Sequence, residues 1–301
     1  MHFRDRPEIS DLIVQYDLAT LERIPVQREE ALQKCFSWYA RSVIASIPHN
    51  DGILCEATVD RMLLEAHQEL QRLWEEFFHA QRIASILKTL VKSLRSMGID
   101  RKIRVVDIGC GIGYVLRWVA TYSSVSQDIS LLGVDFNQTL ISYAKELAKS
   151  EKLDVEFRVA NAFELDVPVD IFISSGVLHH FPNDALERFF EQQAKCNPLA
   201  FAHFDPQYGW ATPVGSFMFH FSRMRTPLAR YDGFLSAARA HSGVVLEQTT
   251  QKCIKNLSLY RYNPPIPWLP LLRTMTGVIA IHPSVSSVFE TEIQEVIQRF
   301  S

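Results

Sequence analysis

The chain has 301 residues, with 31 Lys and Arg against 34 Asp and Glu, which gives a formal net charge of −3. A domain that binds nucleic acid through its phosphates usually carries a basic excess, so we expect no nucleic-acid partner. Hydrophobic residues make up 47% of the chain and charged residues 22%, which is the composition of a folded globular protein and excludes a disordered one.

Cysteine usage and hydropathy bear on the cellular compartment. The five cysteines are scattered and form no C-x-x-C pair: Cys35, Cys55, Cys110, Cys196 and Cys253. A disulfide framework or a structural zinc site needs clustered cysteines, so we expect reduced thiols. The start of the chain shows no apolar signal core, and no apolar run approaches the roughly 18 residues of a membrane span. We therefore expect a cytoplasmic protein without a membrane span.

The first hundred residues are predicted to be helical. One helix is expected over 10–23, and a second follows Pro25 and runs through Val43. In the third and longest helix, apolar residues recur at helical spacing over 70–94.

Beyond residue 102, predicted strands alternate with predicted helices. The strands are expected over 103–107, 131–135, 155–159, 169–174 and 199–204, and the helices include 138–150 and 184–195. This alternation predicts an α/β fold with a doubly wound, mostly parallel sheet. The pattern then weakens, and we predict a helix over 229–240 and strands over 244–249 and 277–281.

A glycine-rich loop follows the first of these strands. Its sequence is Asp107-Ile108-Gly109-Cys110-Gly111-Ile112-Gly113. Closely spaced glycines let the backbone turn tightly and approach a ligand, and the following helix offers free N–H groups. Nicotinamide-binding loops need G-x-G-x-x-G, whose third glycine would fall on Tyr114. The Asp107 carboxylate would also repel a pyrophosphate but suits an ammonium group, so a nicotinamide oxidoreductase is disfavoured.

The pattern Asp107-x-Gly109-x-Gly111-x-Gly113 resembles the first motif of class I S-adenosylmethionine-dependent methyltransferases of the small-molecule type. The resemblance implies a Rossmann-like, seven-stranded sheet with an antiparallel last hairpin. It also implies S-adenosyl-L-methionine as cofactor and S-adenosyl-L-homocysteine as product. In this family the acidic residue reaches the methionyl amino group, so Asp107 is assigned that role, and Gly109, Cys110 and Gly111 are assigned to the cofactor site.

The second predicted strand ends at Asp135, about one βαβ unit after Asp107. The resemblance implies that the Asp135 carboxylate accepts both ribose hydroxyls and that Phe136 forms an apolar wall beside the adenine. The alternative is that Asp135 is only the N-cap of the next helix.

The third predicted strand leads to Asn161, where the family commonly has Asp. An amide oxygen can also accept a hydrogen bond from the adenine amino group, so we keep Asn161 in the site. Ala162 and Phe163 would border the base, with ordinary core packing as the alternative for Phe163.

The fourth predicted strand runs into Ser175-Gly176-Val177-Leu178-His179-His180. This run resembles small-molecule methyltransferases, where Leu-His-His follows the cofactor pocket. The resemblance places Ser175 and Gly176 at the cofactor and the strand end near the transferred methyl group. A histidine suits the role of general base near pH 7. Adjacent residues point in different directions, so we expect at most one of His179 and His180 to face the acceptor, and alternatively both only order the loop.

His203 and Asp205 alternate on the fifth predicted strand and so share a face. His203 is a third candidate catalytic residue, with Asp205 as its carboxylate partner. The alternatives are a weak metal site or polar lining at the edge of the sheet. Metal-dependent transfer would need a cluster of hard oxygen ligands, which the sequence does not supply, so we expect no metal.

A helical cap is expected over 1–98, ahead of a cofactor-binding catalytic domain over 99–301. Residues 206–234 are rich in aromatic side chains, and we interpret them as a lid over the acceptor site. Cap and lid together would close an apolar cavity and exclude water. Arg82 is a candidate for the methionyl carboxylate, or else forms a surface ion pair.

We therefore hypothesise direct in-line methyl transfer to an O, N or C nucleophile of a small, largely apolar or aromatic metabolite, in secondary metabolism. The alternatives are a non-catalytic S-adenosylmethionine-binding subunit of a partner enzyme, and a protein or RNA methyltransferase. A negative chain with a closed aromatic cap disfavours the second of these. The sequence leaves both a monomer and a homodimer open.

Overall fold

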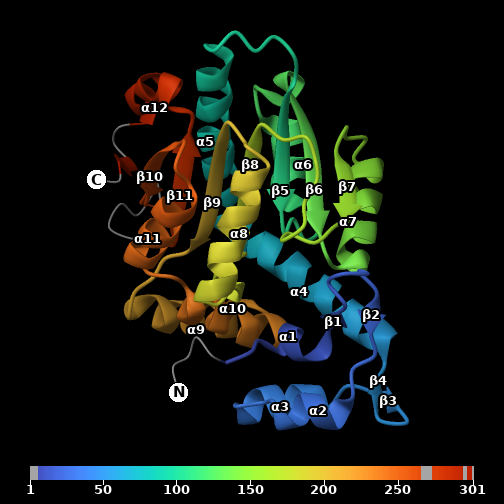
Figure 1. Ribbon diagram of the computed structural model, residues 1–301. Helices are drawn as coiled ribbons and strands as arrows, with labels where there is room; N and C mark the ends of the chain where they lie inside the picture. Colours follow the sequence, from blue (N-terminus) through green and yellow to red (C-terminus); the bar gives the residue numbers. More distant parts are fainter. Residues whose placement is uncertain (1–5, 266–272, 294–296, 300–301) are drawn as a thin grey trace.

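An eight-stranded sheet forms the centre of the computed structural model, which describes residues 6–265, 273–293 and 297–299 (Figure 1). In spatial order the strands are β12 (Ile297–Arg299), β10 (Ser258–Tyr262), β11 (Met275–Ile281), β9 (Ala200–Pro206), β8 (Ile171–Ser175), β5 (Ile103–Ile108), β6 (Ile129–Asp135) and β7 (Glu156–Val159). Strands β5 to β9 are parallel, whereas β11 is antiparallel to both β9 and β10. The predicted seven-stranded, mostly parallel sheet with an antiparallel last hairpin is confirmed, and β12 adds an eighth strand beside β10.

The parallel strands are apolar on both sides because helices cover both faces of the sheet. In β5, Val105 packs in one core and Val106 in the other, as the alternation of side chains along a strand requires. The first face is covered by α5 (His79–Arg95), α6 (Tyr114–Tyr122), α7 (Gln138–Ser150) and α12 (Ser286–Ile293), and the second by α8 (Asn183–Lys195) and α11 (Gly243–Cys253). The two cores fix the strands, so the loops at their carboxyl ends start from rigid positions.

Helix α11 corrects one prediction, because residues 244–249 were expected to form a strand. The Ser242 hydroxyl accepts from the Val245 N–H and caps the helix, and Leu246 and Thr250 are buried one turn apart. The β-branched residues of this segment suggested a strand, but its cap and its helical spacing decide the outcome. On the side of β11 away from β9, the neighbouring strand is β10, which was not predicted from the sequence.

The N-terminal region is less continuous than predicted. The helix expected over 10–23 is only α1 (Ile9–Ile13), followed by a hairpin of β1 (Gln15–Tyr16) and β2 (Arg23–Ile24). The second expected helix is divided into α2 (Arg28–Gln33) and α3 (Trp38–Ala45). A further hairpin, β3 (His49–Asn50) and β4 (Ile53–Leu54), leads into α4 (Glu56–Glu76).

The long helix predicted over 70–94 is divided into α4 and α5 because the chain turns at Phe78. This residue adopts a left-handed backbone conformation, with φ at 52°. Helix α5 packs against the sheet through buried residues such as Ile83 and Leu87. Helix α4 instead leaves the sheet and crosses below its carboxyl edge (Figure 1).

A separate apolar core joins the N-terminal region to α10 (Pro227–Arg239). Its members include Ile9, Leu12, Ile44, Leu63, Leu73, Leu228 and Leu235. Helix α9 (Ala211–Arg223) lies beside α10 below the sheet (Figure 1). We call residues 6–77 and 207–240 the cap. The cap thus combines α1 to α4 with the segment that the sequence suggested as a lid.

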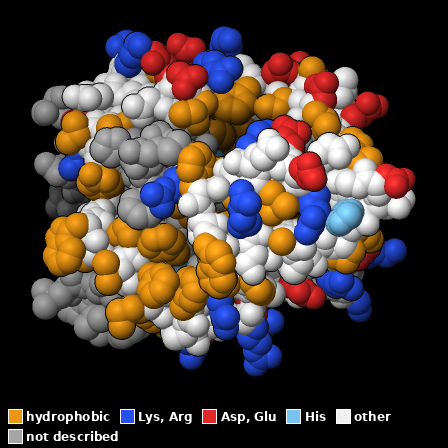
Figure 2. Space-filling view, turned by 90° about the horizontal axis from the view of Figure 1, so that it is seen from below, with side chains coloured by type: hydrophobic (Ala, Val, Ile, Leu, Met, Phe, Trp, Pro, Cys, Tyr) orange, Lys and Arg blue, Asp and Glu red, His pale blue; other side chains and the backbone are white. Residues whose placement is uncertain are grey.

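The cap turns apolar side chains to the outside. Figure 2 views the molecule from the cap side and shows hydrophobic side chains gathered on this face. Trp210, next to α9, is 90% exposed, and Trp38 of α3 is 82% exposed. On its inner side α9 carries small residues, among them Gly215 and Ser216. The inner face of α9 therefore leaves space below the sheet.

Candidate functional site

A cavity of about 950 Å³ lies between the carboxyl edge of the sheet and the cap. The loops after β5, β6, β7 and β8 form its upper side, and α4, α9 and α10 contribute to its lower side. All eleven residues assigned to the cofactor line it: Asp107, Gly109, Cys110, Gly111, Asp135, Phe136, Asn161, Ala162, Phe163, Ser175 and Gly176. Loops that are separate in sequence meet here because parallel strands end at the same edge.

Two glycines of the loop after β5 occupy positions that other residues adopt only at a cost. Gly109 has φ at 68°, and a Cβ there would lie 2.5 Å from Val177 Cγ2. Gly113 has φ at 73°, and a Cβ there would overlap the Phe157 ring. The loop therefore fits tightly against its neighbours, while Gly109 and Gly111 also line the cavity.

The buried carboxylate of Asp107 stands at the carboxyl end of β5. Burial raises the pKa of Asp107 well above its usual range, and the nearby charge of Asp135 raises it further. A positive group in the cavity would relieve both effects. The geometry therefore offers a place for an amino group, in keeping with the role that the sequence assigned to Asp107.

Asp135 connects the glycine loop to the next helix. Its Oδ2 accepts from the Gly111 N–H at 3.0 Å, and its Oδ1 accepts from the Asn137 N–H at 2.9 Å. Each oxygen keeps a lone pair for a ligand hydroxyl. The alternative role of Asp135 as N-cap is wrong, because Asn137 Oδ1 accepts from the first N–H groups of α7. Phe136 is half-exposed and lies edge-on to Tyr16, with ring centroids 5.4 Å apart.

Asn161 is held in one orientation by its own loop and by the cap. Its Oδ1 accepts from the Phe163 N–H at 3.0 Å, and its Nδ2 donates to the Leu18 carbonyl at 3.1 Å. The amide oxygen therefore has one lone pair left for a ligand. The Phe163 ring both lines the cavity and lies edge-on to Phe181, 5.1 Å between centroids, so packing and site lining are combined.

Ser175 is fixed by a histidine that the sequence analysis did not consider. His79 Nε2 lies 2.5 Å from Ser175 Oγ, and the His79 ring stacks on Trp74 with centroids 5.0 Å apart. Burial, together with Arg82, lowers the pKa of His79 to about 3, so this ring is neutral. Arg82 does not line the cavity; it is buried and donates to the Pro264 carbonyl at 3.0 Å. Both roles considered for Arg82, the methionyl carboxylate and a surface ion pair, are therefore wrong.

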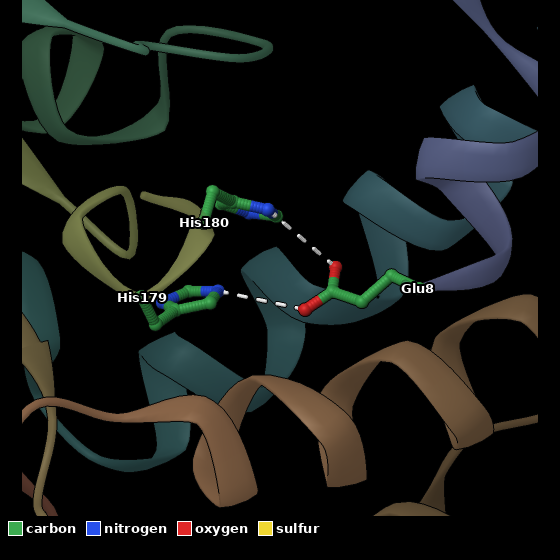
Figure 3. A group of neighbouring side chains, drawn as sticks. All are labelled: Glu8, His179 and His180. Atoms are coloured by element: carbon green, nitrogen blue, oxygen red, sulfur yellow. Dashed lines mark ion pairs between the residues drawn. The ribbon is translucent and has the colours of Figure 1, made fainter. Parts of the chain in front are cut away.

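His179 lies at the other end of the cavity. Its Nδ1 is 2.9 Å from Asp205 Oδ1. Because a carboxylate only accepts, Nδ1 carries a proton, and Nε2 is the ring nitrogen left for another partner. This Nε2 points toward Glu8 Oε1, 3.7 Å away (Figure 3). It has no hydrogen-bond partner among the described residues, and His179 is only 4% exposed.

His180 faces the same carboxylate from its other side. Its Nδ1 lies 3.9 Å from Glu8 Oε2 and 3.7 Å from Asp11 Oδ1 (Figure 3). Burial lowers the pKa of His180, but the charges of Glu8 and Asp11 outweigh this effect and raise it to about 9. Both histidines line the cavity, and the expectation that at most one of them faces the acceptor stays a prediction. They lie in a 3₁₀ turn, Leu178–His180, which sets the two rings 4.3 Å apart.

Glu8 is a functional candidate that the sequence analysis missed. It precedes α1, whose Ile9 and Ser10 N–H groups donate to the Asp232 carboxylate at 2.7 and 3.0 Å. Ser236 Oγ donates to Glu8 Oε1 at 2.9 Å, so α10 holds both the start of α1 and the Glu8 side chain. In the sequence around Glu8, the one recognisable feature is the reciprocal capping pattern with Asp11 at the start of α1. This pattern indicates the start of a helix but not a functional site.

The assignment of His203 as a catalytic residue is wrong. Its ring is fully buried, with Nδ1 2.8 Å from Ser174 Oγ and Nε2 2.7 Å from Gln193 Oε1. Burial also lowers the pKa of His203 to about 3. His203 does not line the cavity, because it lies deeper in the sheet, whereas Asp205 reaches the edge. Asp205 therefore pairs with His179 and not with His203.

Residues 105–196 match the family model described as a methyltransferase domain. They contain the glycine loop, Asp135, Asn161 and the histidine pair. This part of the chain is a class I methyltransferase domain. The class I methyltransferase predicted from the glycine loop is thus confirmed for the domain.

Two comparisons place this methyltransferase domain among known proteins. Phosphoethanolamine N-methyltransferase 3 of Arabidopsis thaliana is 32% identical over 96 residues, which are 31% of this chain and 19% of that protein. The match therefore spans about a fifth of the length of that relative. The plantazolicin methyltransferase BpumL, crystallised with a pentazolic desmethylPZN analogue and SAH, superposes with a TM-score of 0.52 at 11% identity, over 76% of this chain and 100% of that one. At this identity the second likeness shows the fold.

Proposed function

We propose that the protein is an S-adenosylmethionine-dependent methyltransferase that acts on a small, largely apolar or aromatic acceptor. The observation that carries this proposal is the continuous cavity between the glycine loop and the His179–Asp205 pair. A methyl donor at one end and an acceptor at the other would be held in line within this space. The product is S-adenosylhomocysteine, and the methyl group goes to an O, N or C nucleophile.

The cofactor end is assigned by the chemistry of its side chains. Asp107 would bind the methionyl ammonium group, whose charge opposes the raised pKa of this carboxyl. Asp135 would accept the ribose hydroxyls through the lone pairs that its two backbone contacts leave free. Asn161 would accept from the adenine amino group, with the Phe136 and Phe163 rings beside the base.

The acceptor end combines apolar walls with a polar floor. Apolar side chains from α4 and α9 line it, including Leu63, Leu70, Trp74, Phe77 and Phe219. Such walls favour an acceptor with a hydrophobic body and exclude water from the reacting groups. His179 and His180 form part of the polar end and are the side chains that we place against the nucleophile.

The names of the compared proteins support a small acceptor. The Arabidopsis relative is named for N-methylation of phosphoethanolamine, and BpumL was crystallised with a small desmethylPZN analogue. A role in secondary metabolism is part of the same proposal. No helix within the described residues combines the length and the hydropathy needed to cross a membrane.

The test is a calorimetric titration of the purified protein with S-adenosylhomocysteine and, separately, with NADH. We expect micromolar binding of S-adenosylhomocysteine and none of NADH. Removing the carboxylate in Asp135→Ala should weaken binding about tenfold to a hundredfold, because hydrogen bonds to a charged group are lost.

The matched control is Asp154→Ala, which removes an exposed carboxylate outside the cavity and should bind like the wild type. Folded protein that fails to bind S-adenosylhomocysteine would refute the proposal. Binding without methyl transfer to any of a panel of hydroxyl, amine and carbon-nucleophile acceptors would favour a non-catalytic subunit.

A further inference from the structure

Glu8, His179 and His180 form a compact group of donor atoms at the polar end of the cavity. One ligand atom from each lies within 4.8 Å of the others, with 3.7 Å between His179 Nε2 and Glu8 Oε1 and 3.9 Å between His180 Nδ1 and Glu8 Oε2 (Figure 3). Donors around one tetrahedral zinc ion, each at about 2.1 Å, lie roughly 3.4 Å apart. A small rotation of these side chains would bring the three donors to that spacing.

The orientation of His179 points to a cation between these donors. Its Nδ1 proton is donated to Asp205, so Nε2 is the atom that faces the Glu8 carboxylate. A nitrogen and a carboxylate oxygen that face each other in a buried site need a proton or a metal cation between them. Within the described part of the chain, Nε2 has no hydrogen-bond partner that would supply one. A carboxylate that orients a histidine in this way is also the usual support of a metal-bound imidazole.

Charged side chains of both signs surround this group. Four carboxylates lie here, those of Glu8, Asp11, Asp205 and Asp232. Arg239 neutralises part of their charge, since its Nη1 lies 2.8 Å from Asp11 Oδ2 and 3.5 Å from Glu8 Oε1. Arg6 lines the adjoining hollow and adds a second positive charge. Neither arginine lies between Glu8 and the two histidine rings, so the space where a divalent cation would bind is bordered by the Glu8 carboxylate and the two imidazoles.

We infer that Glu8, His179 and His180 bind a divalent transition-metal ion, with Asp205 as the residue that positions His179. Two imidazoles and one carboxylate leave coordination positions open, as in catalytic and not in structural zinc sites. From the sequence we expected no metal, because no cluster of hard oxygen ligands was apparent; Glu8, far from the histidines in the chain, was not considered.

The use of such an ion rests on the proposed function. The open positions adjoin the cavity, so an oxygen of the acceptor, such as a hydroxyl or a carboxylate, would bind there. Coordination lowers the pKa of a bound hydroxyl, so the ion would favour oxygen-bearing acceptors. With the metal bound, His179 Nε2 is a ligand and cannot also act as the general base.

The experiment is a zinc titration of full-length protein stripped with EDTA and dialysed, followed by metal analysis. We expect one zinc per chain with micromolar or tighter affinity. His179→Ala and Glu8→Gln should each weaken binding at least about tenfold, and Asp205→Asn should do so through the orientation of the imidazole. Circular dichroism and S-adenosylhomocysteine binding show whether each variant is folded, since the proposed cofactor residues lie at the other end of the cavity.

A second group, Glu187, Glu191 and Cys253 on the outside of α8 and α11, provides the matched control. Glu191→Gln should leave the zinc stoichiometry and affinity unchanged. The inference is overturned if wild-type protein binds no zinc, or if zinc is lost in Glu191→Gln and retained in His179→Ala. Full methyl transfer by the stripped protein, unchanged on adding zinc, overturns the role of the ion and assigns His179 as a base. These readouts are separate from S-adenosylhomocysteine binding, which tests the proposed function.

Discussion

The two ends of the cavity are assembled in different ways. Every residue that we assign to the cofactor lies at or just after the carboxyl end of one of four parallel strands, between Asp107 and Gly176. The polar end of the acceptor site instead joins Glu8, at the beginning of the described chain, to the turn after β8, to Asp205 on β9 and to Asp232 on α10. The first end depends on backbone geometry next to a rigid sheet. The second depends on how the cap docks.

The largest expected effect is at the glycine loop. In Gly113→Ala the new methyl group would overlap the Phe157 ring, and the residue would keep a left-handed conformation. Overpacking and backbone strain together should lower the free energy of unfolding by about 2–5 kcal/mol and abolish S-adenosylhomocysteine binding.

Gly98→Ala is the control for the strain alone. Gly98 has φ at 79°, and no described atom lies within 4 Å of the added Cβ. Urea unfolding should show a loss of about 1 kcal/mol, with S-adenosylhomocysteine binding unchanged. Equal losses in the two variants would mean that the fit of the loop against Phe157 is unimportant.

A substitution at the amino edge of the sheet, opposite the cavity, should change the stability of the protein without changing ligand binding. Asp170, before β8, is bound by the Arg101 and Arg104 guanidinium groups and by the Arg104 N–H. Asp170→Asn should lower the free energy of unfolding at pH 7 by about 1–2 kcal/mol, a modest amount because the arginines are partly exposed. The affinity for S-adenosylhomocysteine should be unchanged.

The sign of its pH dependence follows from the carboxyl group. Burial acts to raise the pKa of Asp170, but the two arginines hold it well below its usual range. The stabilisation by Asp170 is therefore complete above about 3.9, the pKa of this carboxyl in the unfolded chain. It is lost progressively as the pH falls below that value toward the lower pKa of the folded state. Urea unfolding should show a smaller difference between wild type and variant at pH 3 than at pH 7. A difference that stays constant would show that the charge of Asp170 plays no part.

The smallest expected effect is in the cap. The Glu69 carboxylate of α4 accepts from the Arg225 and Thr226 N–H groups, both at 3.0 Å, and so joins α4 to the start of α10. Glu69→Gln should cost about 1 kcal/mol of stability and raise the KM for the acceptor severalfold, with the affinity for S-adenosylhomocysteine unchanged. If Glu69→Gln weakened S-adenosylhomocysteine binding by the same factor as it raised the KM for the acceptor, the cofactor end and the acceptor end of the cavity would not be independent.

The difference between the cofactor end and the polar end of the cavity also explains which parts of the molecule could be predicted from the sequence. The parallel strands, α7 and α8 were placed within a few residues, because apolar runs and helical spacing are local signals. The glycine loop was assigned from the residue types that its geometry requires. By contrast, Val244 and Val245 suggested a strand, although the Ser242 cap and the helical spacing of Leu246 and Thr250 place them in α11.

The polar end could not be assembled from local patterns. Glu8 reaches the histidines only because Asp232 accepts from the first N–H groups of α1, a contact between distant segments. His203 looked equivalent to His179 by residue type, and only the depth of each residue in the fold distinguishes them. The break at Phe78 had no glycine or proline to mark it, so α4 and α5 were predicted as one helix.

The raised pKa of the buried Asp107 carboxyl has a consequence for how ligand binding is measured. An ammonium group placed beside it lowers that pKa again, so in mildly acidic solution the protein releases a proton as the ligand enters. The buffer takes up this proton with its own heat of ionisation. The enthalpy seen by calorimetry then differs between buffers in proportion to the number of protons released, so its buffer dependence reports the change in protonation that accompanies binding.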